Sequence, residues 1–134
     1  MRTTAVLVRS RPLAAQLRTL GAPFPIAFVL LKPEYEVLFL PCIEQLAGKP
    51  LGGRPGIRPD ARWNGSDWES RRGVKEWLSE RFPEGRRYKP TVDQLPMTRM
   101  LDLDRLSAAD VPCFGTLERA LRFLAQHPAG EVYP

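Results

Sequence analysis

The chain has 134 residues, of which 43% are hydrophobic and 26% are charged, a composition typical of one folded soluble domain rather than a disordered segment. Lys and Arg exceed Asp and Glu by 20 to 15, so the net charge of +5 favours polyanionic partners such as nucleic acid. Two cysteines and one histidine are too few for a tetrahedral zinc site, and no apolar run is long enough to cross a membrane.

The N-terminal third predicts a parallel βαβ unit. Residues 3–8 are an apolar, β-branched run, and residues 25–31 are another run of strand length. Between them, Ser10 can cap a helix that ends at Gly21. Because parallel sheets normally have more strands, we expect later segments, a partner chain or a missing N-terminal portion to complete this sheet.

The remainder predicts helices joined by one long loop. A helical pattern begins at Glu34 and is interrupted by Pro41, and residues 48–65 form a loop rich in Gly and Pro. Further helices are predicted over residues 66–82, after Thr91 and over residues 115–126, with a loose tail at 128–134. The expected fold class is therefore α/β: a small parallel βαβ core followed by a mostly helical C-terminal half, in a single domain over residues 1–134.

Glu34 and Glu36 follow the second predicted strand, and ligands of open α/β sheets bind at the carboxyl ends of strands. On a helix the two side chains would point about 200° apart, so they cannot hold one ion together. Either acid could help to bind a divalent metal or a basic partner, or both could stabilise the start of a helix. Asp102 and Asp104 form another Asp-x-Asp pair, for which a helix cap is the favoured interpretation.

Arg86, Arg87 and Lys89 surround Tyr88 in a predicted loop. Such a cluster can bind phosphates while its ring stacks on a base, and Arg71 and Arg72 could extend the same surface. The alternative is an exposed loop whose tyrosine packs back on the core.

Other chemistry has little support in the sequence. His127 has no accompanying serine or acid that would form a catalytic triad, and the Gly-rich loop lacks the Gly-Lys-Ser/Thr of a nucleotide-binding P-loop. We therefore predict no cofactor. The two separated thiols, Cys42 and Cys113, and the lack of a secretory leader predict a reduced, cytoplasmic protein.

Several short motifs follow one another along the chain: Glu34-Tyr35-Glu36, Leu38-Phe39-Leu40, Lys75-Glu76-Trp77-Leu78, Tyr88-Lys89, Asp93-Gln94, Asp102 and Pro112-Cys113-Phe114. Their order resembles the C-terminal half of the domain-of-unknown-function family 4276, over roughly residues 3–126. That family is similar to Toprim domains, and its members often accompany ATPases in bacterial defence loci.

The resemblance implies a metal-binding fold whose acids are largely missing here. In the Toprim pattern, a glutamate and an Asp-x-Asp at strand ends hold magnesium. If residues 3–8 match the strand before Asp-x-Asp, Arg9 and Arg11 replace the two acids and would repel the ion. The half that would carry the glutamate is absent, so we expect an N-terminal truncation.

The leading hypothesis is therefore a basic, non-catalytic, Toprim-related subunit of a bacterial antiviral-defence or DNA-transaction assembly. It would bind nucleic acid, or an ATPase, another subunit or a second copy that completes its sheet. One alternative is a magnesium-dependent nuclease whose remaining acids lie upstream or in another chain. The other is a module that only binds proteins.

Overall fold

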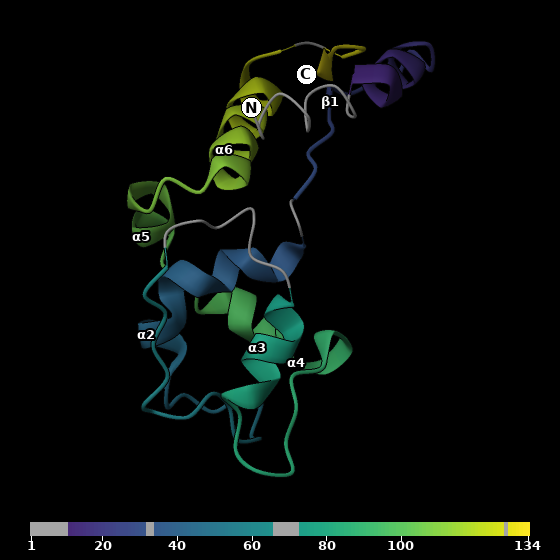
Figure 1. The fold of residues 1–134 in the computed structure, drawn as a ribbon. Coiled ribbons are helices and arrows are strands. Elements are labelled where there is room, and N and C mark those ends of the chain that lie inside the picture. The colour runs from purple at the N-terminus through teal and green to yellow at the C-terminus, as the bar shows by residue number, and fades with distance from the viewer. Residues whose placement is uncertain (1–10, 32–33, 66–72, 128) are drawn as a thin grey trace. The chain divides into compact units, whose positions relative to one another are not determined.

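The computed structural model describes residues 11–31, 34–65, 73–127 and 129–134 (Figure 1). The chain divides into two compact units: Met1–Lys32 with Pro112–Pro134, and Pro33–Val111. Its described elements are mostly helices, with one two-stranded parallel sheet. The predicted mixed α/β class is thus confirmed, and a later segment of the chain supplies a strand of the sheet, which is one of the expected alternatives.

The first unit joins the two ends of the chain. It contains a helix over residues 11–18, strand β1 (Ile26–Ala27), helix α6 (Pro112–Gln126) and strand β2 (Val132–Tyr133). The strands pair in parallel, Ile26 with Val132 and Ala27 with Tyr133.

In the described structure β1 pairs with β2, which lies in the segment predicted to be a loose tail, residues 128–134. The backbone N–H of Ile26 donates to the Glu131 carbonyl at 2.9 Å, and that of Phe28 donates to Tyr133 at 2.9 Å. Val132 is only 4% exposed, and the Arg18 guanidinium donates to its carbonyl at 3.1 Å. The loose-tail prediction is therefore wrong for Val132 and Tyr133. The other predicted strand, residues 3–8, lies outside the described residues.

The helices of this unit bury several small side chains and leave some leucines exposed. Ala14 is fully buried in the helix over residues 11–18, whereas Leu13 is 41% exposed. In α6 the buried side chains include Thr116 and Ala120, whereas Leu121 is 57% exposed. The structure thus has a helix in both places where the sequence predicts one, over residues 11–18 and over Pro112–Gln126.

The second unit is built around a short 3-10 helix, η1 (Tyr35–Cys42), which contacts each of the four helices α2, α3, α4 and α5. The bounds of these helices are Ile43–Leu46, Val74–Glu80, Pro90–Arg99 and Leu103–Ala108. Val37 and Phe39 of η1 are fully buried. Pro41 has no N–H to donate, which is consistent with the division of this helical stretch into η1 and α2. A helix was predicted over residues 66–82, and the structure shows α3 in the C-terminal part of this range. Residues 66–72 lie outside the described part.

Residues 48–65 contain a tight turn but no helix. Leu51 and Arg54 exchange two backbone hydrogen bonds of 2.8 and 3.0 Å around Gly52 and Gly53. Both glycines have positive φ, +58° and +81°, as a type I′ turn requires. The turn holds the Arg54 backbone in a defined position.

None of the described helices has the length and apolar character of a membrane-spanning segment.

Candidate functional site

Glu34 directly precedes η1 and Glu36 lies in its first turn, and the two have separate local roles. Glu34 Oε1 accepts a hydrogen bond of 3.1 Å from the Val74 N–H, at the start of α3. Its other oxygen lies 3.4 Å from Lys75 Nζ. These contacts satisfy a helix N-terminal donor and attach η1 to α3. Glu34 thus acts as a cap supplied from a distant part of the chain.

Glu36 is buried, with 1% of its surface exposed. Its Oε1 accepts hydrogen bonds from the Tyr88 hydroxyl at 2.8 Å and from Gln94 Nε2 at 3.1 Å. A buried carboxylate needs such donors, because burial removes its hydration. The three side chains tie η1 to the loop before α4 and to α4 itself.

Arg86 and Asp93 form a buried ion pair beside this cluster. Two guanidinium nitrogens donate to the two carboxylate oxygens at 2.9 and 2.6 Å, and the Lys89 N–H donates to the same carboxylate at 2.8 Å. Only 10% of the Arg86 side chain and none of the Asp93 side chain is exposed. The guanidinium also lies over the Phe82 ring, 4.7 Å from its centroid. This bidentate geometry fixes the loop onto the first turn of α4.

Burial and hydrogen bonding shift the pKa values of these groups in definite directions. Burial alone would raise the pKa of the Asp93 carboxyl, but hydrogen bonds from Arg86 and the Lys89 N–H outweigh it and lower the pKa. Burial, followed by the hydrogen bond to Glu36, raises the pKa of the Tyr88 hydroxyl. At neutral pH Tyr88 is therefore a neutral donor and Asp93 an anion.

The predicted phosphate-binding loop has two opposite sides. Arg86 and Tyr88 face the interior, and Tyr88 is only 5% exposed, so its ring cannot stack on a base. Arg87 and Lys89 are exposed. The alternative that the tyrosine packs on the core is thus correct. Of the other predicted site residues, Arg11 is exposed in the first unit, whereas Arg9, Arg71 and Arg72 lie outside the described chain.

A second basic loop lies beside the first, and no sequence motif pointed to it. The Arg58 N–H donates to the Arg81 carbonyl at 2.8 Å, and its guanidinium donates to the Phe82 carbonyl at 3.1 Å. These bonds hold residues 48–59 against the start of the loop that carries Arg87. The positive charge of Arg54 also helps to lower the pKa of Asp93. The clue in the sequence was the recurrence of cations between the prolines and glycines of this loop.

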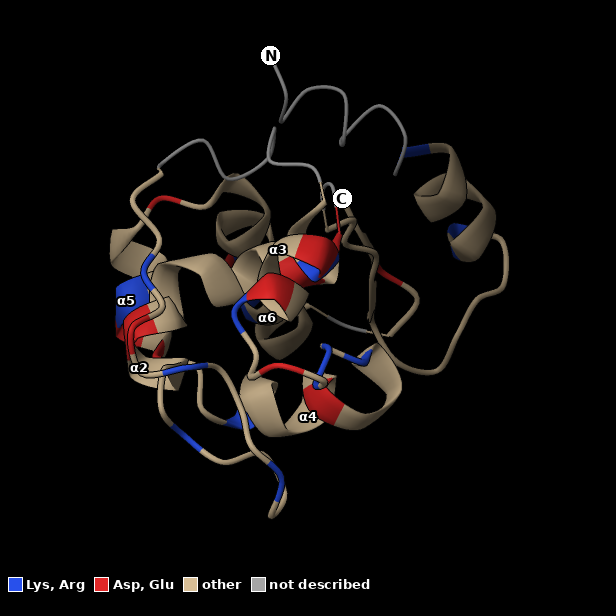
Figure 2. Cartoon of the chain, turned by 60° about the horizontal axis from the view of Figure 1, so that its bottom comes forward, with Lys and Arg blue, Asp and Glu red and all other residues tan. Residues whose placement is uncertain are grey.

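Together these loops form what we call the basic loop face, defined by Lys49, Arg54, Arg87 and Lys89. All four residues are exposed, and none forms a salt bridge with an acid of the described chain. In Figure 2 Lys and Arg positions recur along the loops near α2 and α4. The face therefore presents unpaired positive charge from two segments about 35 residues apart.

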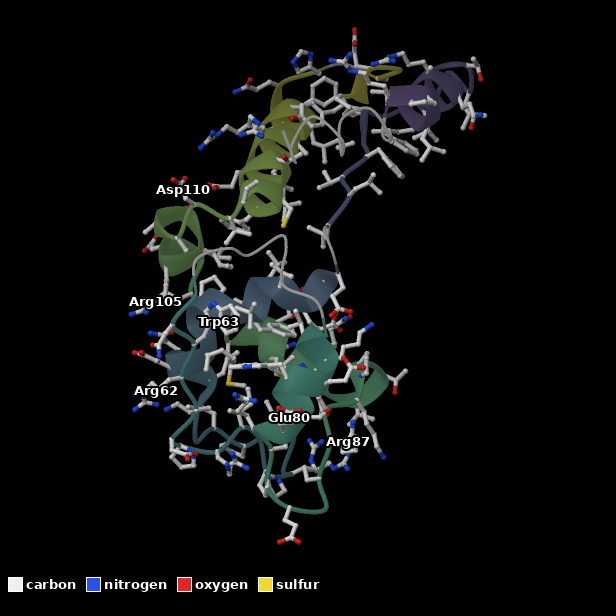
Figure 3. The ribbon with its side chains drawn as sticks, viewed as in Figure 1. Arg62, Trp63, Glu80, Arg87, Arg105 and Asp110 are labelled. Carbon is white, nitrogen blue, oxygen red and sulfur yellow. The ribbon has the colours of Figure 1, made fainter. Side chains whose placement is uncertain are left out.

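The second unit also has a pocket of about 590 Å³ between η1, α2 and α5. Trp63 and Arg105, labelled in Figure 3, line it together with the acids Glu44 and Asp104. Its charges are mixed, so it does not extend the positive surface.

The described acids do not assemble a metal centre. Within residues 11–31, 34–65, 73–127 and 129–134, no three His, Cys, Asp or Glu side chains come close enough to hold an ion. Asp102 accepts a hydrogen bond of 3.1 Å from the Arg105 N–H and caps α5, as the favoured interpretation predicted. Glu34, Glu36, Asp93 and Asp102 thus each have a structural partner.

Comparison of the chain with protein families, with curated proteins and with solved structures found no match.

Proposed function

We propose that this chain binds nucleic acid without catalysing its cleavage, and that the basic loop face contacts the phosphate backbone. The observation that carries the proposal is the exposure of Lys49, Arg54, Arg87 and Lys89 on two adjacent loops without a described acidic partner. Cations that are not neutralised within the protein can replace the counterions condensed on a polyanion. Arg86 supports this face from inside and does not belong to it.

The structural roles of the acids support a binding function over a nuclease. Glu34 caps α3, Glu36 receives Tyr88 and Gln94, and Asp93 is paired with Arg86. A magnesium-dependent nuclease built on these acids would have to break those contacts first. The Toprim-like identity, the bacterial-defence setting and an ATPase partner stay predictions from sequence.

A protein-binding module is the second candidate. Leu20, Phe24 and Leu121 of the first unit are 68%, 58% and 57% exposed. Large apolar side chains at such exposure are common at protein interfaces when they are contiguous.

The test is a salt titration of binding to a fluorescein-labelled oligonucleotide, read by fluorescence anisotropy. We expect micromolar binding at low salt. The double variant Arg87→Ala with Lys89→Ala should weaken this binding and reduce the slope of log K against log salt by about 1 to 2. The matched control is Arg11→Ala with Arg122→Ala, which removes the same charge from the first unit.

Equal weakening by both pairs would mean that only net charge matters and would contradict a localised face. Lack of binding at low salt would reject the nucleic-acid function and leave the protein-binding candidate.

A further inference from the structure

A small pocket lies on the second basic loop, residues 48–59, beside Pro83. It has a volume of about 270 Å³ and is lined by four prolines, Pro50, Pro55, Pro59 and Pro83. Lys49 and Arg58 also line it. This volume is slightly below the roughly 300–1,000 Å³ of typical small-molecule sites, so the pocket suits one flat ring system better than a whole cofactor.

Close backbone contacts fix the shape of the loop that carries the pocket. The Gly48 N–H donates to the Ile57 carbonyl at 2.8 Å, closing the loop across its base. At Gly56 an added Cβ would come within 2.2 Å of the Lys49 carbonyl oxygen, so the two sides of the loop approach as closely as the backbone allows. The pyrrolidine rings of Pro50, Pro55 and Pro59 on this loop lose little conformational freedom when a ligand enters.

The polar rim of the pocket fits an anionic ligand that carries a flat apolar part. The Arg58 guanidinium is fixed by the Phe82 carbonyl at 3.1 Å and lies 3.5 Å from Asp60, which is 79% exposed and offsets part of its charge. Lys49 is exposed and makes no described salt bridge. A planar guanidinium can stack on a base, and prolines can pack against base faces.

We propose that this proline pocket takes one unstacked base of a single-stranded nucleic acid, whose phosphates lie along Lys49 and Arg54. The inference rests on the proposed function and specifies its substrate class. The bases of a duplex are paired and stacked, so they cannot enter a lateral pocket. Recognition in a duplex groove usually requires a helix or β-ribbon, whereas this face is made of loops. Because the Tyr88 ring is buried, the prolines are the stacking surface that this face offers.

The experiment compares three labelled ligands on the full chain by anisotropy at one low salt concentration: a 12-nucleotide oligo(dT), an abasic 12-mer with the same phosphates, and a 12-base-pair duplex. We expect oligo(dT) to bind about fivefold more tightly than the abasic strand, since one base–protein stack contributes at the low end of measured values. It should also bind more tightly than the duplex.

Two variants separate the base from the phosphates. Pro50→Ala with Pro55→Ala should abolish the preference for oligo(dT) and leave abasic binding unchanged. Arg54→Ala, at a phosphate-contacting residue that does not line the pocket, should weaken both strands by the same factor. Equal affinity of the wild-type chain for oligo(dT) and the abasic strand, or tighter duplex binding, would overturn the base pocket while the proposed function stands. If none of the three ligands binds, both fail.

A second measurement covers the case in which the proline variant does not fold. Oligo(dT) containing 4-thiothymidine is cross-linked to the wild-type chain, and the modified peptide is located by mass spectrometry. Cross-links within residues 48–59 or at Pro83 support the pocket, and cross-links confined to other segments overturn it.

Discussion

The ion pair between Arg86 and Asp93 places two opposite charges where water reaches little of either side chain. Its hydrogen bonds join the loop to α4, and the guanidinium also covers Phe82. The adjacent Arg87 lies on the outside of the same loop. At the residue scale, neighbouring arginines therefore have different functions, one in stability and one in the proposed binding.

Arg86→Ala is expected to destabilise the protein by about 3–5 kcal/mol, because it leaves the Asp93 carboxylate buried without its partner. Chemical denaturation followed by circular dichroism measures this. The matched control is Arg87→Ala, an exposed substitution that should stay within about 0.5 kcal/mol. A similar small effect for Arg86→Ala would mean that Asp93 finds water or another donor.

Asp93 also makes stability depend on acid pH. Its pKa in the folded protein is lowered from 3.8, so its contribution is fully present above that pH and is lost as the pH falls below 3.8 toward the folded-state pKa. Between pH 6 and pH 3 the wild-type protein should therefore lose more unfolding free energy than Asp93→Asn. Parallel curves for the two proteins in urea titrations would exclude Asp93 as a source of the pH dependence.

At the scale of elements, helix starts in the second unit are fixed by acids. Asp102 caps α5 from the adjacent position in the chain, whereas Glu34 satisfies the Val74 N–H of α3 from 40 residues away. The first contact is visible in sequence because a cap and its donor are three residues apart. The second depends on how η1 and α3 pack.

Asp102→Ala should cost about 0.5–2 kcal/mol through loss of the α5 cap, and Asp102→Asn should retain most of the stability. Thermal unfolding of both variants gives the comparison. If Asn proves as destabilising as Ala, the carboxylate charge rather than its cap hydrogen bond is what stabilises this end of α5.

At the scale of the whole molecule, both loops of the basic loop face belong to the unit formed by Pro33–Val111. All the contacts described for these loops lie inside that unit. The net charge of +5 lies in the first unit, whereas the unit formed by Pro33–Val111 has 13 Lys or Arg and 13 Asp or Glu and is neutral overall. The proposed phosphate contacts therefore depend on the local exposure of a few cations and not on net charge.

A fragment of residues 33–111 is therefore expected to fold and to bind oligonucleotide with the salt slope of the full chain. Circular dichroism establishes folding, and anisotropy establishes binding. A folded fragment with a much smaller slope would place phosphate contacts in the first unit and contradict a face confined to these loops.

The sequence by itself determined the features that depend on neighbours in the chain. These are the mixed class, the helical stretches, the interruption at Pro41, the Asp102 cap and the basic character of residues 86–89. Periodicity, capping residues and proline act over a few residues, so they can be interpreted without a fold.

Only the tertiary structure decided which side chains are interior and which segments meet. The C-terminal residues pair with β1 across more than 100 positions, and Arg54 comes to the side of Asp93 from a different loop. Arg86 and Arg87 are chemically identical in the sequence, and they differ because Asp93 and Phe82 occupy only one side of their loop. Such contacts are set by packing between distant segments, which no local pattern specifies.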